Sequence, residues 1–218
     1  MLAVDCAVGN GSIAILRGET LLATSVDGSP ARAEEILVII RDLLVGTKSN
    51  LSDIDAMAVS VGPGSYSGIR IGIATATGLA AALSVPCLGV STLSALSLSV
   101  KANGRSVTAV PVGKRHLGWL AYDVEGGGAT PVGEPGMETD DRFCLEVESV
   151  GAHSVVCDRS VASRVRAVMP TSFNIDVPEE DLAELIGRFA YVYPDHCSLR
   201  PIYLRDKAER SGQPTLAK

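Results

Sequence analysis

The sequence contains few of the residues that build metal centres and disulfide frameworks. Its 218 residues include five cysteines, an odd number with no CxxC pair, and three histidines that lie far apart. This pattern argues against a disulfide scaffold, a zinc knuckle and a helical two-histidine metal site. We therefore expect no metal ion on this chain, and the scattered free cysteines favour a reducing, cytoplasmic compartment.

Basic residues and nucleophile motifs are also scarce. Lysine and arginine number 19 against 25 aspartates and glutamates, which gives a net charge of −6. The sequence lacks the basic stripe of a chain that binds nucleic acid by itself. It also lacks a GxSxG elbow and a histidine motif beside any cysteine. These absences leave no candidate catalytic residue.

Charged residues are absent from Ile71 to Val100. Such a stretch resembles a membrane span on hydropathy alone. Pro86 and Gly89 interrupt it, however, and serine and threonine are frequent in it. The central helix and strand of an α/β domain have the same composition. We therefore expect no membrane segment, and no basic-then-apolar leader opens the sequence.

A strand, a glycine-rich loop and a helix form the centre of the sequence. Residues 56–61 are apolar and rich in β-branched side chains, and Gly62-Pro63-Gly64 predicts a tight turn after them. An alanine-rich helix follows, with Ser67 as its expected N-cap. Such a loop can bind an anion through free N–H groups. Its GxGxxxG spacing, with no following lysine, fits no strong phosphate signature, so a structural turn is favoured.

The helix after the loop has a row of small residues at every fourth position, namely Gly68, Gly72, Ala76 and Ala80. Glycine inside a soluble helix costs about 1 kcal/mol relative to alanine, so close approach of another backbone is the expected reason. That backbone belongs either to the sheet of the same domain or to a helix of a second subunit. The sequence alone leaves both alternatives open.

The order of predicted elements indicates two halves that join near residues 101–105. The first half is predicted to contain strands at 2–5, 12–16, 20–26 and 56–61, a strand near Cys87, and helices over 31–45, 71–83 and 92–100. The second half is predicted to contain strands at 106–112, 117–124 and 154–157, and a helix with Pro178 at its first position. Three antiparallel strands followed by alternating helices and strands indicate an α/β fold.

Several segments together resemble the bacterial TsaB family, also called YeaZ. Residues 62–83 read GPGSYSGIRIGIATATGLAAAL, where the family reads approximately GPGSFTGLRIG followed by a small-residue helix. The match continues through Gly89-Val90-Ser91-Thr92-Leu93, and it includes the opening strand and the segment 200–205 near the C-terminus. The resemblance implies an actin-like/sugar-kinase (ASKHA) architecture with two ribonuclease-H-like subdomains. Residues 1–102 would form the partner-binding subdomain, and residues 103–218 a smaller, degenerate one with a polar tail from about Leu204.

The resemblance also implies a function. TsaB is similar to TsaD but lacks its catalytic site, and TsaD transfers a threonylcarbamoyl group to the adenosine beside the anticodon of tRNAs that read codons beginning with A. A TsaB-like chain would bind TsaD directly as a non-catalytic scaffold. TsaE, a small ATPase, would join the assembly, and TsaC would supply the activated threonylcarbamoyl group. ATP and metal are then expected in the partner subunits and tRNA only through the complex, and self-association of the isolated chain stays open.

Two sets of site residues follow from this resemblance. The residues expected to contact the partner lie on the two helices over 31–45 and 68–83, and they are Ile36, Ile40, Gly68, Arg70, Gly72, Ile73, Ala76 and Ala80. Related kinases hold metal-bound phosphates near an aspartate that ends the first strand. The corresponding candidate anion or nucleotide residues here are Asp5, Gly62, Gly64 and Ser65.

Two departures from the family pattern leave other functions to consider. The family carries a DARxGEVY-like stretch where residues 111–119 read PVGKRHLGW, and Cys6 stands where threonine is common. One alternative is an ATP-dependent small-molecule kinase or ATPase that uses Asp5 and the loop over 62–68. Another is a glycoprotease-like peptidase, against which the missing nucleophile and metal motifs argue.

Overall fold

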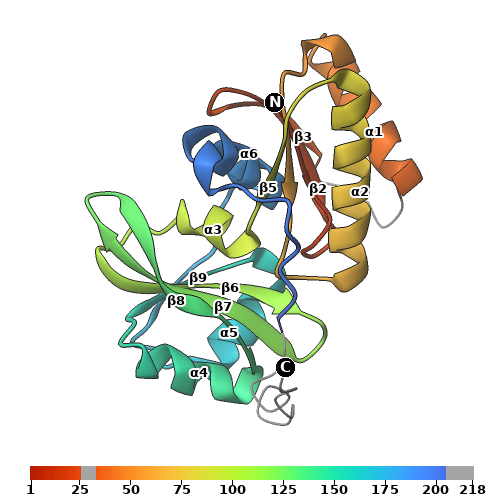
Figure 1. The fold of residues 1–218 in the computed structure, drawn as a ribbon. Coiled ribbons are helices and arrows are strands. Elements are labelled where there is room, and N and C mark those ends of the chain that lie inside the picture. Colours follow the sequence, from red (N-terminus) through yellow and green to blue (C-terminus); the bar gives the residue numbers. More distant parts are fainter. Residues whose placement is uncertain (26–32, 205–218) are drawn as a thin grey trace, which may run out of the picture.

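Two β-sheets, each flanked by helices, form the two lobes of this computed structural model, which describes residues 1–25 and 33–204 (Figure 1). The elements of the first lobe are β1 (Leu2–Asp5), β2 (Ser12–Arg17), β3 (Thr20–Ser25), α1 (Ala33–Gly46), a 3₁₀ turn (Leu51–Asp53), β4 (Met57–Ser60), α2 (Tyr66–Leu83), β5 (Cys87–Val90) and α3 (Thr92–Ser97). The strand order in its sheet is β3-β2-β1-β4-β5. Strands β1, β2 and β3 are antiparallel, whereas β4 and β5 run parallel to β1.

The second lobe repeats this topology. Its elements are β6 (Gly104–Val112), β7 (His116–Glu125), β8 (Gly128–Thr139), α4 (Asp140–Ser149), β9 (Ser154–Cys157), a 3₁₀ turn (Arg159–Val161), α5 (Ala162–Val168) and β10 (Asn174–Asp176). The strand order β10-β9-β6-β7-β8 is that of the first sheet, with three antiparallel strands followed by two parallel ones. Its two flanking helices have 10 and 7 residues, against 14 and 18 in α1 and α2. The predicted duplicated α/β fold is therefore confirmed.

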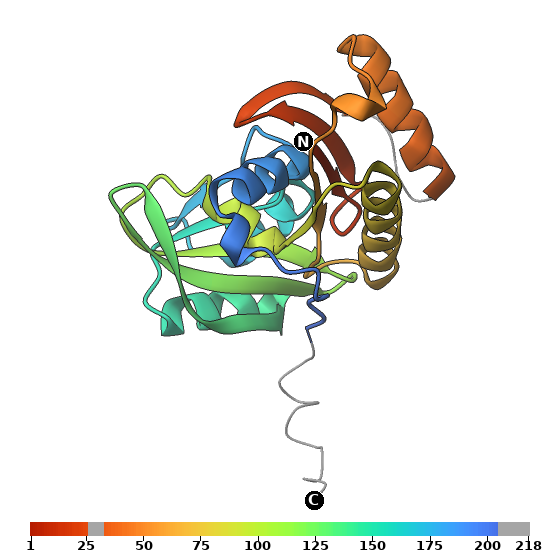
Figure 2. The same cartoon turned by 45° about the horizontal axis from the view of Figure 1, so that its top comes forward.

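Helices cover both faces of the first sheet. Alternate residues of a strand point to opposite faces, so Leu2 and Val4 of β1 pack with α1 and α2, whereas Ala3 packs with α3 and α6 (Leu182–Val192). Figure 2 shows α1 and α2 together on the side of the sheet away from α6. Helix α6 therefore follows the second lobe in sequence but packs on the first sheet.

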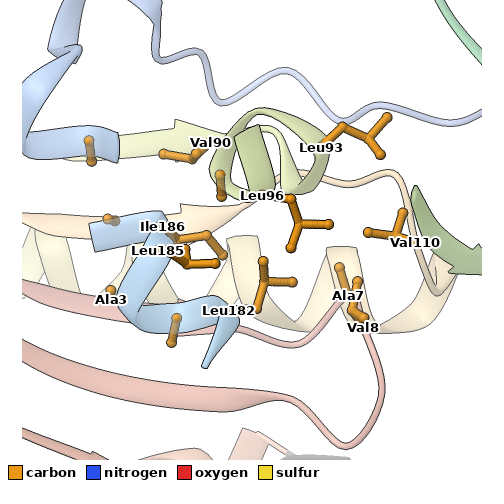
Figure 3. Packing of buried hydrophobic residues seen from close by; sticks show 14 of the residues in the cluster. Ala3, Ala7, Val8, Val90, Leu93, Leu96, Val110, Leu182, Leu185 and Ile186 are labelled. Carbon is orange, nitrogen blue, oxygen red and sulfur yellow. The ribbon is translucent and has the colours of Figure 1, made fainter. Parts of the chain in front are cut away.

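The two lobes share one hydrophobic core. Figure 3 shows Leu93 and Leu96 of α3 beside residues of the first lobe and Val110 of β6. Tyr122 of β7 belongs to the same buried cluster, and its hydroxyl donates to the Ser94 hydroxyl at 3.3 Å. Helix α3 therefore connects the lobes by packing as well as through the chain.

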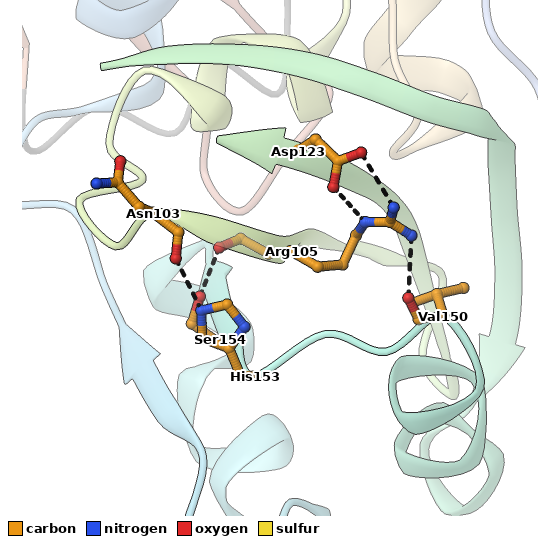
Figure 4. A network of polar contacts seen from close by, with 7 residues as sticks. Asn103, Arg105, Asp123, Val150, His153 and Ser154 are labelled. Atoms are coloured by element: carbon orange, nitrogen blue, oxygen red, sulfur yellow. Dashed lines mark hydrogen bonds and ion pairs between the residues drawn. The ribbon is translucent and has the colours of Figure 1, made fainter. Parts of the chain in front are cut away.

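A polar network fixes the start of the second lobe (Figure 4). The Arg105 guanidinium donates to both carboxylate oxygens of Asp123, at 2.6 and 3.0 Å, and to the carbonyl of Val150 at 3.0 Å. His153 contacts the carbonyl of Asn103 through Nε2 at 3.1 Å. Strand β6 is thereby tied to its neighbour β7 and to the loop before β9. The division at residue 102 into two functional domains stays a prediction.

The structure corrects several element boundaries. The N-cap of α2 is Ser65, whose hydroxyl accepts from the Gly68 amide, and not Ser67. Helix α6 starts at Leu182 after Asp181, so Pro178 precedes it and is not its first residue. The sequence patterns also missed β8, α4, α5 and β10. Residues 26–32 and the predicted polar tail from 205 onward lie outside the described residues. None of the described helices is both long and apolar enough to cross a membrane.

Candidate functional site

The small-residue row of α2 faces the chain's own sheet. Gly68, Gly72, Ala76 and Ala80 are all buried. A Cβ atom at Gly68 would overlap the carbonyl of Cys6, and one at Gly72 would lie 3.4 Å from a side-chain carbon of Cys6. The close backbone neighbour of this row is therefore the end of β1. This corrects the expectation that these four residues contact a partner directly.

The two α1 residues expected to bind a partner are also internal. Ile36 and Ile40 are buried in the cluster between α1 and the first sheet. They point inward because helical residues four apart lie on one face, and that face is the apolar one. Among the predicted contact residues, Ile73 is half-buried and Arg70 is exposed. A partner that approached these helices would therefore touch Arg70 and the residues around it.

The exposed sides of α1 and α2 form a surface that the sequence analysis did not single out. On α2, the exposed residues at helical spacing are Tyr66, Arg70, Ala74, Gly78 and Ala81. On α1, three apolar side chains are 50%, 47% and 71% exposed, and they are Leu37, Val38 and Val45. We call these eight residues the helix-pair surface. Apolar side chains exposed on a helix, here interspersed with the charged residues Arg41 and Asp42, occur at protein interaction sites.

An aromatic and guanidinium cluster lies at one end of the helix-pair surface. The Arg70 guanidinium carbon is 4.1 Å from the centre of the Tyr66 ring. The centres of the Tyr66 and Tyr203 rings are 4.9 Å apart, and Arg70 Nε donates to the Tyr203 hydroxyl at 3.4 Å. Tyr203 belongs to the segment after α6, 133 residues from Arg70 in sequence. Spacing along the sequence gave no signal for this contact.

The candidate anion loop is occupied by contacts within the chain. The Ser65 amide donates to the carbonyl of Ala7 at 2.7 Å, and a Cβ atom at Gly64 would overlap that same carbonyl. Gly62 has φ +95°, and its carbonyl accepts from the Thr92 amide at 2.9 Å. The glycines therefore serve a turn and a close approach of two loops. This geometry favours a structural turn.

Asp5 lies in a different environment from the loop. Its carboxylate is fully buried and accepts from the Ala7 amide at 2.8 Å. Burial raises the pKa of Asp5 to about 6, hydrogen bonds from Ser60 and Ala7 oppose part of this rise, and Asp158 adds to it. Burial likewise raises the pKa of the neighbouring Cys6 thiol, to about 12, so this thiol is neutral at pH 7. The chain brings Asp5 to a cavity but leaves Gly62, Gly64 and Ser65 outside its lining.

The cavity beside Asp5 lies between the lobes and has a volume of about 290 Å³. Its lining includes four carboxylates and one basic residue, namely Asp5, Asp158, Glu180, Asp181 and Arg159. The Arg159 guanidinium donates to the carbonyls of Pro178 and Glu179. The hydroxyl of Ser12, in the β-hairpin that follows Asp5, accepts from the Ala183 amide at 3.0 Å. Arg159 and Ser12 are therefore engaged in bonds within the fold.

A metal-bound nucleotide, which the sugar-kinase fold would imply, does not fit these residues. The carboxylates repel a metal-free polyphosphate, so binding would depend on a metal ion held between the carboxylates and the phosphates. In the described part of the chain, no three His, Cys, Asp or Glu side chains lie together as metal ligands. Sequence reasoning missed Asp158, Glu180 and Asp181 because they come from the second half of the chain and meet Asp5 only in the fold.

Comparison with known proteins identifies the family. The model of a family described as "TsaD: tRNA N6-adenosine threonylcarbamoyltransferase" matches residues 28–136. The Escherichia coli "tRNA threonylcarbamoyladenosine biosynthesis protein TsaB" is 34% identical over 125 residues, which are 56% of this chain and 54% of that protein. A Haemophilus influenzae protein with the same description is 33% identical over 98 residues, or 44% of this chain and 41% of that protein. The matches span about half the length of these relatives.

Solved structures support the same assignment over most of the chain. A Pseudomonas aeruginosa protein, described as having similarity to peptidase YeaZ, superposes with a TM-score of 0.69 and 25% identity over 94% of this chain and 98% of its own. Component A of the (R)-2-hydroxyglutaryl-CoA dehydratase from Acidaminococcus fermentans superposes with a TM-score of 0.54 at 13% identity, over 88% of this chain and 97% of its own, and shows the fold alone. The chain belongs to the TsaD family that the matching model describes, and within it to the TsaB, or YeaZ, type with an actin-like/sugar-kinase fold.

Proposed function

We propose that this chain is a non-catalytic subunit in the biosynthesis of threonylcarbamoyladenosine in tRNA, and that it binds TsaD through the helix-pair surface. The observation that supports this most is the exposure of apolar and small residues on α1 and α2. TsaD would then modify the adenosine beside the anticodon, with TsaE and TsaC acting in the same process. The names of the relatives support the process, and the surface supports the mode of binding.

The composition of the helix-pair surface suits close packing of another helix pair. Ala74, Gly78 and Ala81 let a second backbone approach α2, while Val38 and Val45 of α1 supply apolar area. The TsaD family model matches residues 28–136, which include both helices. A TsaD subunit would therefore present an equivalent helix pair. Two like surfaces can then pack about an approximate two-fold axis, as in isologous dimers.

The same reasoning allows self-association when TsaD is absent. A surface built for a related helix pair can also accept a second copy of this chain. Homodimer and heterodimer would then exclude each other, because both bury α1 and α2. Added TsaD would be expected to convert the homodimer into the heterodimer.

The interlobe cavity supports a non-catalytic role. A kinase or ATPase of this fold needs a site for metal-bound phosphates between the lobes, and in the described residues the acidic side chains of this lining do not come together as metal ligands. The net charge of −6 favours tRNA contact through the other subunits. One similar structure is described by its likeness to a peptidase. A metal-dependent peptidase would need a group of metal ligands, and none is assembled in the described residues of this chain.

A matched pair of variants in α2 tests the proposal, namely Gly78→Leu and its buried counterpart Gly72→Leu, which should destabilise the chain itself. Gly78 has open space around it, whereas Gly72 lies against Cys6 and Val59. We expect Gly78→Leu to leave the chain folded and to raise the Kd for TsaD at least about tenfold, because the added side chain blocks close approach. Sedimentation of mixtures with TsaD from the same genome measures this, and threonylcarbamoyl transfer to tRNA by the complete mixture gives a second readout.

A second pair controls for a general effect of surface charge. Val45 on α1 and Leu145 on α4 are both exposed apolar residues, at 71% and 62%. Val45→Asp should weaken the complex, whereas Leu145→Asp in the second lobe should not. No complex between the wild-type chain and TsaD at micromolar concentration would contradict the proposed function.

A further inference from the structure

The segment after α6 crosses the first sheet at the carboxyl ends of its parallel strands. The Ser198 amide donates to the carbonyl of Gly89 in the edge strand β5 at 2.8 Å. The Ile202 amide donates to the carbonyl of Val61, directly after β4, also at 2.8 Å. We call residues 198–204 the strap. In Figure 1 it is the dark blue segment that descends between the lobes beside the lower end of α2.

Glycines create the space that the strap occupies. A Cβ atom at Gly89 would overlap the carbonyl of Ser198, and one at Gly62 would lie 2.7 Å from the carbonyl of Ile202. At Gly118 of β7, a Cβ atom would lie 3.1 Å from the side chain of Leu204. Three glycines from both lobes therefore border one segment. Any larger residue at Gly89 or Gly62 would force the strap or the sheet to move.

The strap carries Tyr203 to the outer side of α2. Its ring packs on Tyr66, its hydroxyl accepts from Arg70, and the two tyrosines still remain 42% and 55% exposed. In the described residues no carboxylate forms a salt bridge with Arg70, although other arginines of the chain do so. The cluster thus exposes two aromatic rings and a guanidinium on the outer side of α2.

This cluster continues the helix-pair surface. Tyr66 and Arg70 are the first two residues of the exposed row that runs on through Ala74, Gly78 and Ala81 of α2. Tyrosine and arginine are the residue types that contribute most to binding energy at protein interfaces. Small residues along the rest of the row allow the close approach that would bring a partner onto the cluster.

We infer that the strap is a positioning element of the partner-binding surface, and that it presents Tyr203, with Tyr66 and Arg70, as an anchor for TsaD. The inference rests on the proposed function and adds to it a segment outside both helices. The expected complement on TsaD is a carboxylate facing Arg70 within an apolar contact for the two rings. Because the strap is already attached to the sheet, binding would not have to order Tyr203 from a free chain.

Tyrosine variants test the anchor. Tyr203→Ala should raise the Kd for TsaD at least about tenfold, the effect typical of an interface hot spot. Tyr203→Phe keeps the ring and should change the Kd by less than about threefold. Tyr191 on α6 is 54% exposed and remote from α2, so Tyr191→Ala is the matched control and should leave the Kd unchanged.

Full-length variants that release the strap test its positioning role. Gly89→Ala should displace Ser198, speed amide hydrogen exchange at Ser198 and Ile202, whose amides are bonded to the first sheet, and raise the Kd to that of Tyr203→Ala. The double variant should bind no more weakly than either single one, because both remove the same anchor. If Gly89→Ala disturbs β5, Ile202→Pro gives the same test from the strap itself, since it removes the amide donor to Val61 and leaves β5 unchanged in sequence.

The outcomes separate this inference from the proposed function. A wild-type Kd retained by Tyr203→Ala, or by a variant with a released strap, would overturn the inference and leave TsaD binding intact. Loss of TsaD binding by the wild-type chain would instead overturn the proposed function. Additive effects of Gly89→Ala and Tyr203→Ala would show that the strap does not act through Tyr203, which also overturns the inference.

Discussion

Replacing Asp5 by asparagine should change how the stability of the chain depends on pH. The side chain is fully buried, and burial raises its pKa from 3.8 to about 6. Asparagine has the same shape, and its carbonyl oxygen can still accept from the Ala7 amide. The substitution therefore removes the ionisation of Asp5 while keeping most of its packing. Asp5→Asn isolates the free-energy cost of the buried charge.

The sign follows from proton binding. Between pH 3.8 and about 6, the folded chain holds a proton on Asp5 that the unfolded chain has released. Stability must then fall as pH rises through this window, because the folded state binds more protons than the unfolded state. A difference of about two pH units corresponds to about 3 kcal/mol at 1.36 kcal/mol per unit. Above pH 6 the wild-type chain bears this whole cost.

Urea unfolding followed by circular dichroism, at pH values from 4 to 8, measures the effect. The quantity to compare is the difference in unfolding free energy between Asp5→Asn and wild type, in which the contributions of titrating groups that do not interact with Asp5 cancel. We expect the variant to gain about 2 kcal/mol relative to wild type between pH 4 and pH 7, because a small part of the full cost is already present at pH 4. A difference that does not vary with pH would refute the reasoning, because it would mean that Asp5 titrates alike in both states.

Other predictions concern packing in the first lobe and use unfolding free energies in urea. Gly78→Ala should stabilise the chain by up to about 1 kcal/mol, since the helix position is exposed and open, whereas Gly72→Leu should destabilise it by about 1–3 kcal/mol by overpacking against Cys6. If Gly78→Ala lowered the unfolding free energy and Gly72→Leu raised it, the assignment of the two faces of α2 would be refuted. Thr92→Val should cost about 1–2 kcal/mol, because the buried Thr92 hydroxyl donates to the carbonyl of Pro63 at 2.7 Å. An unchanged urea midpoint would show that water replaces this bond.

The first lobe was predicted well because its sequence signals agree with one another. Strands β1, β2 and β4 are short apolar runs, and α1 has a clear apolar stripe with Ile36 and Ile40 at its centre. Strand β8 was missed because Pro131 and Pro135 argue against a strand, although both are tolerated at the edge of a sheet. Helix α4 was missed because it buries only Phe143 and Val147. Such elements depend on tertiary packing more than on local pattern.

The candidate site shows a different limit of sequence reasoning. Both faces of α2 carry small residues, so the pattern could not decide whether Gly72 or Gly78 faces a partner. In the structure, the tight contact of the first row with Cys6 assigns it to the sheet and leaves the second row exposed. Tyr203 could not be connected with Arg70 from spacing, because the strap reaches α2 only through its backbone bonds to the first sheet.

The shared core bears on whether the lobes move. Enzymes that close two domains around a ligand need an interface that can open at small cost. Separating these lobes would expose Leu93, Leu96 and Tyr122, and each large side chain brought into water costs about 2 kcal/mol. The strap also touches both lobes, since its backbone is bonded to the first sheet and its Leu204 side chain lies against Gly118 of the second. A chain held in one arrangement can present a fixed surface to TsaD, and this rigidity supports the proposed scaffold role over a catalytic cycle of opening and closing.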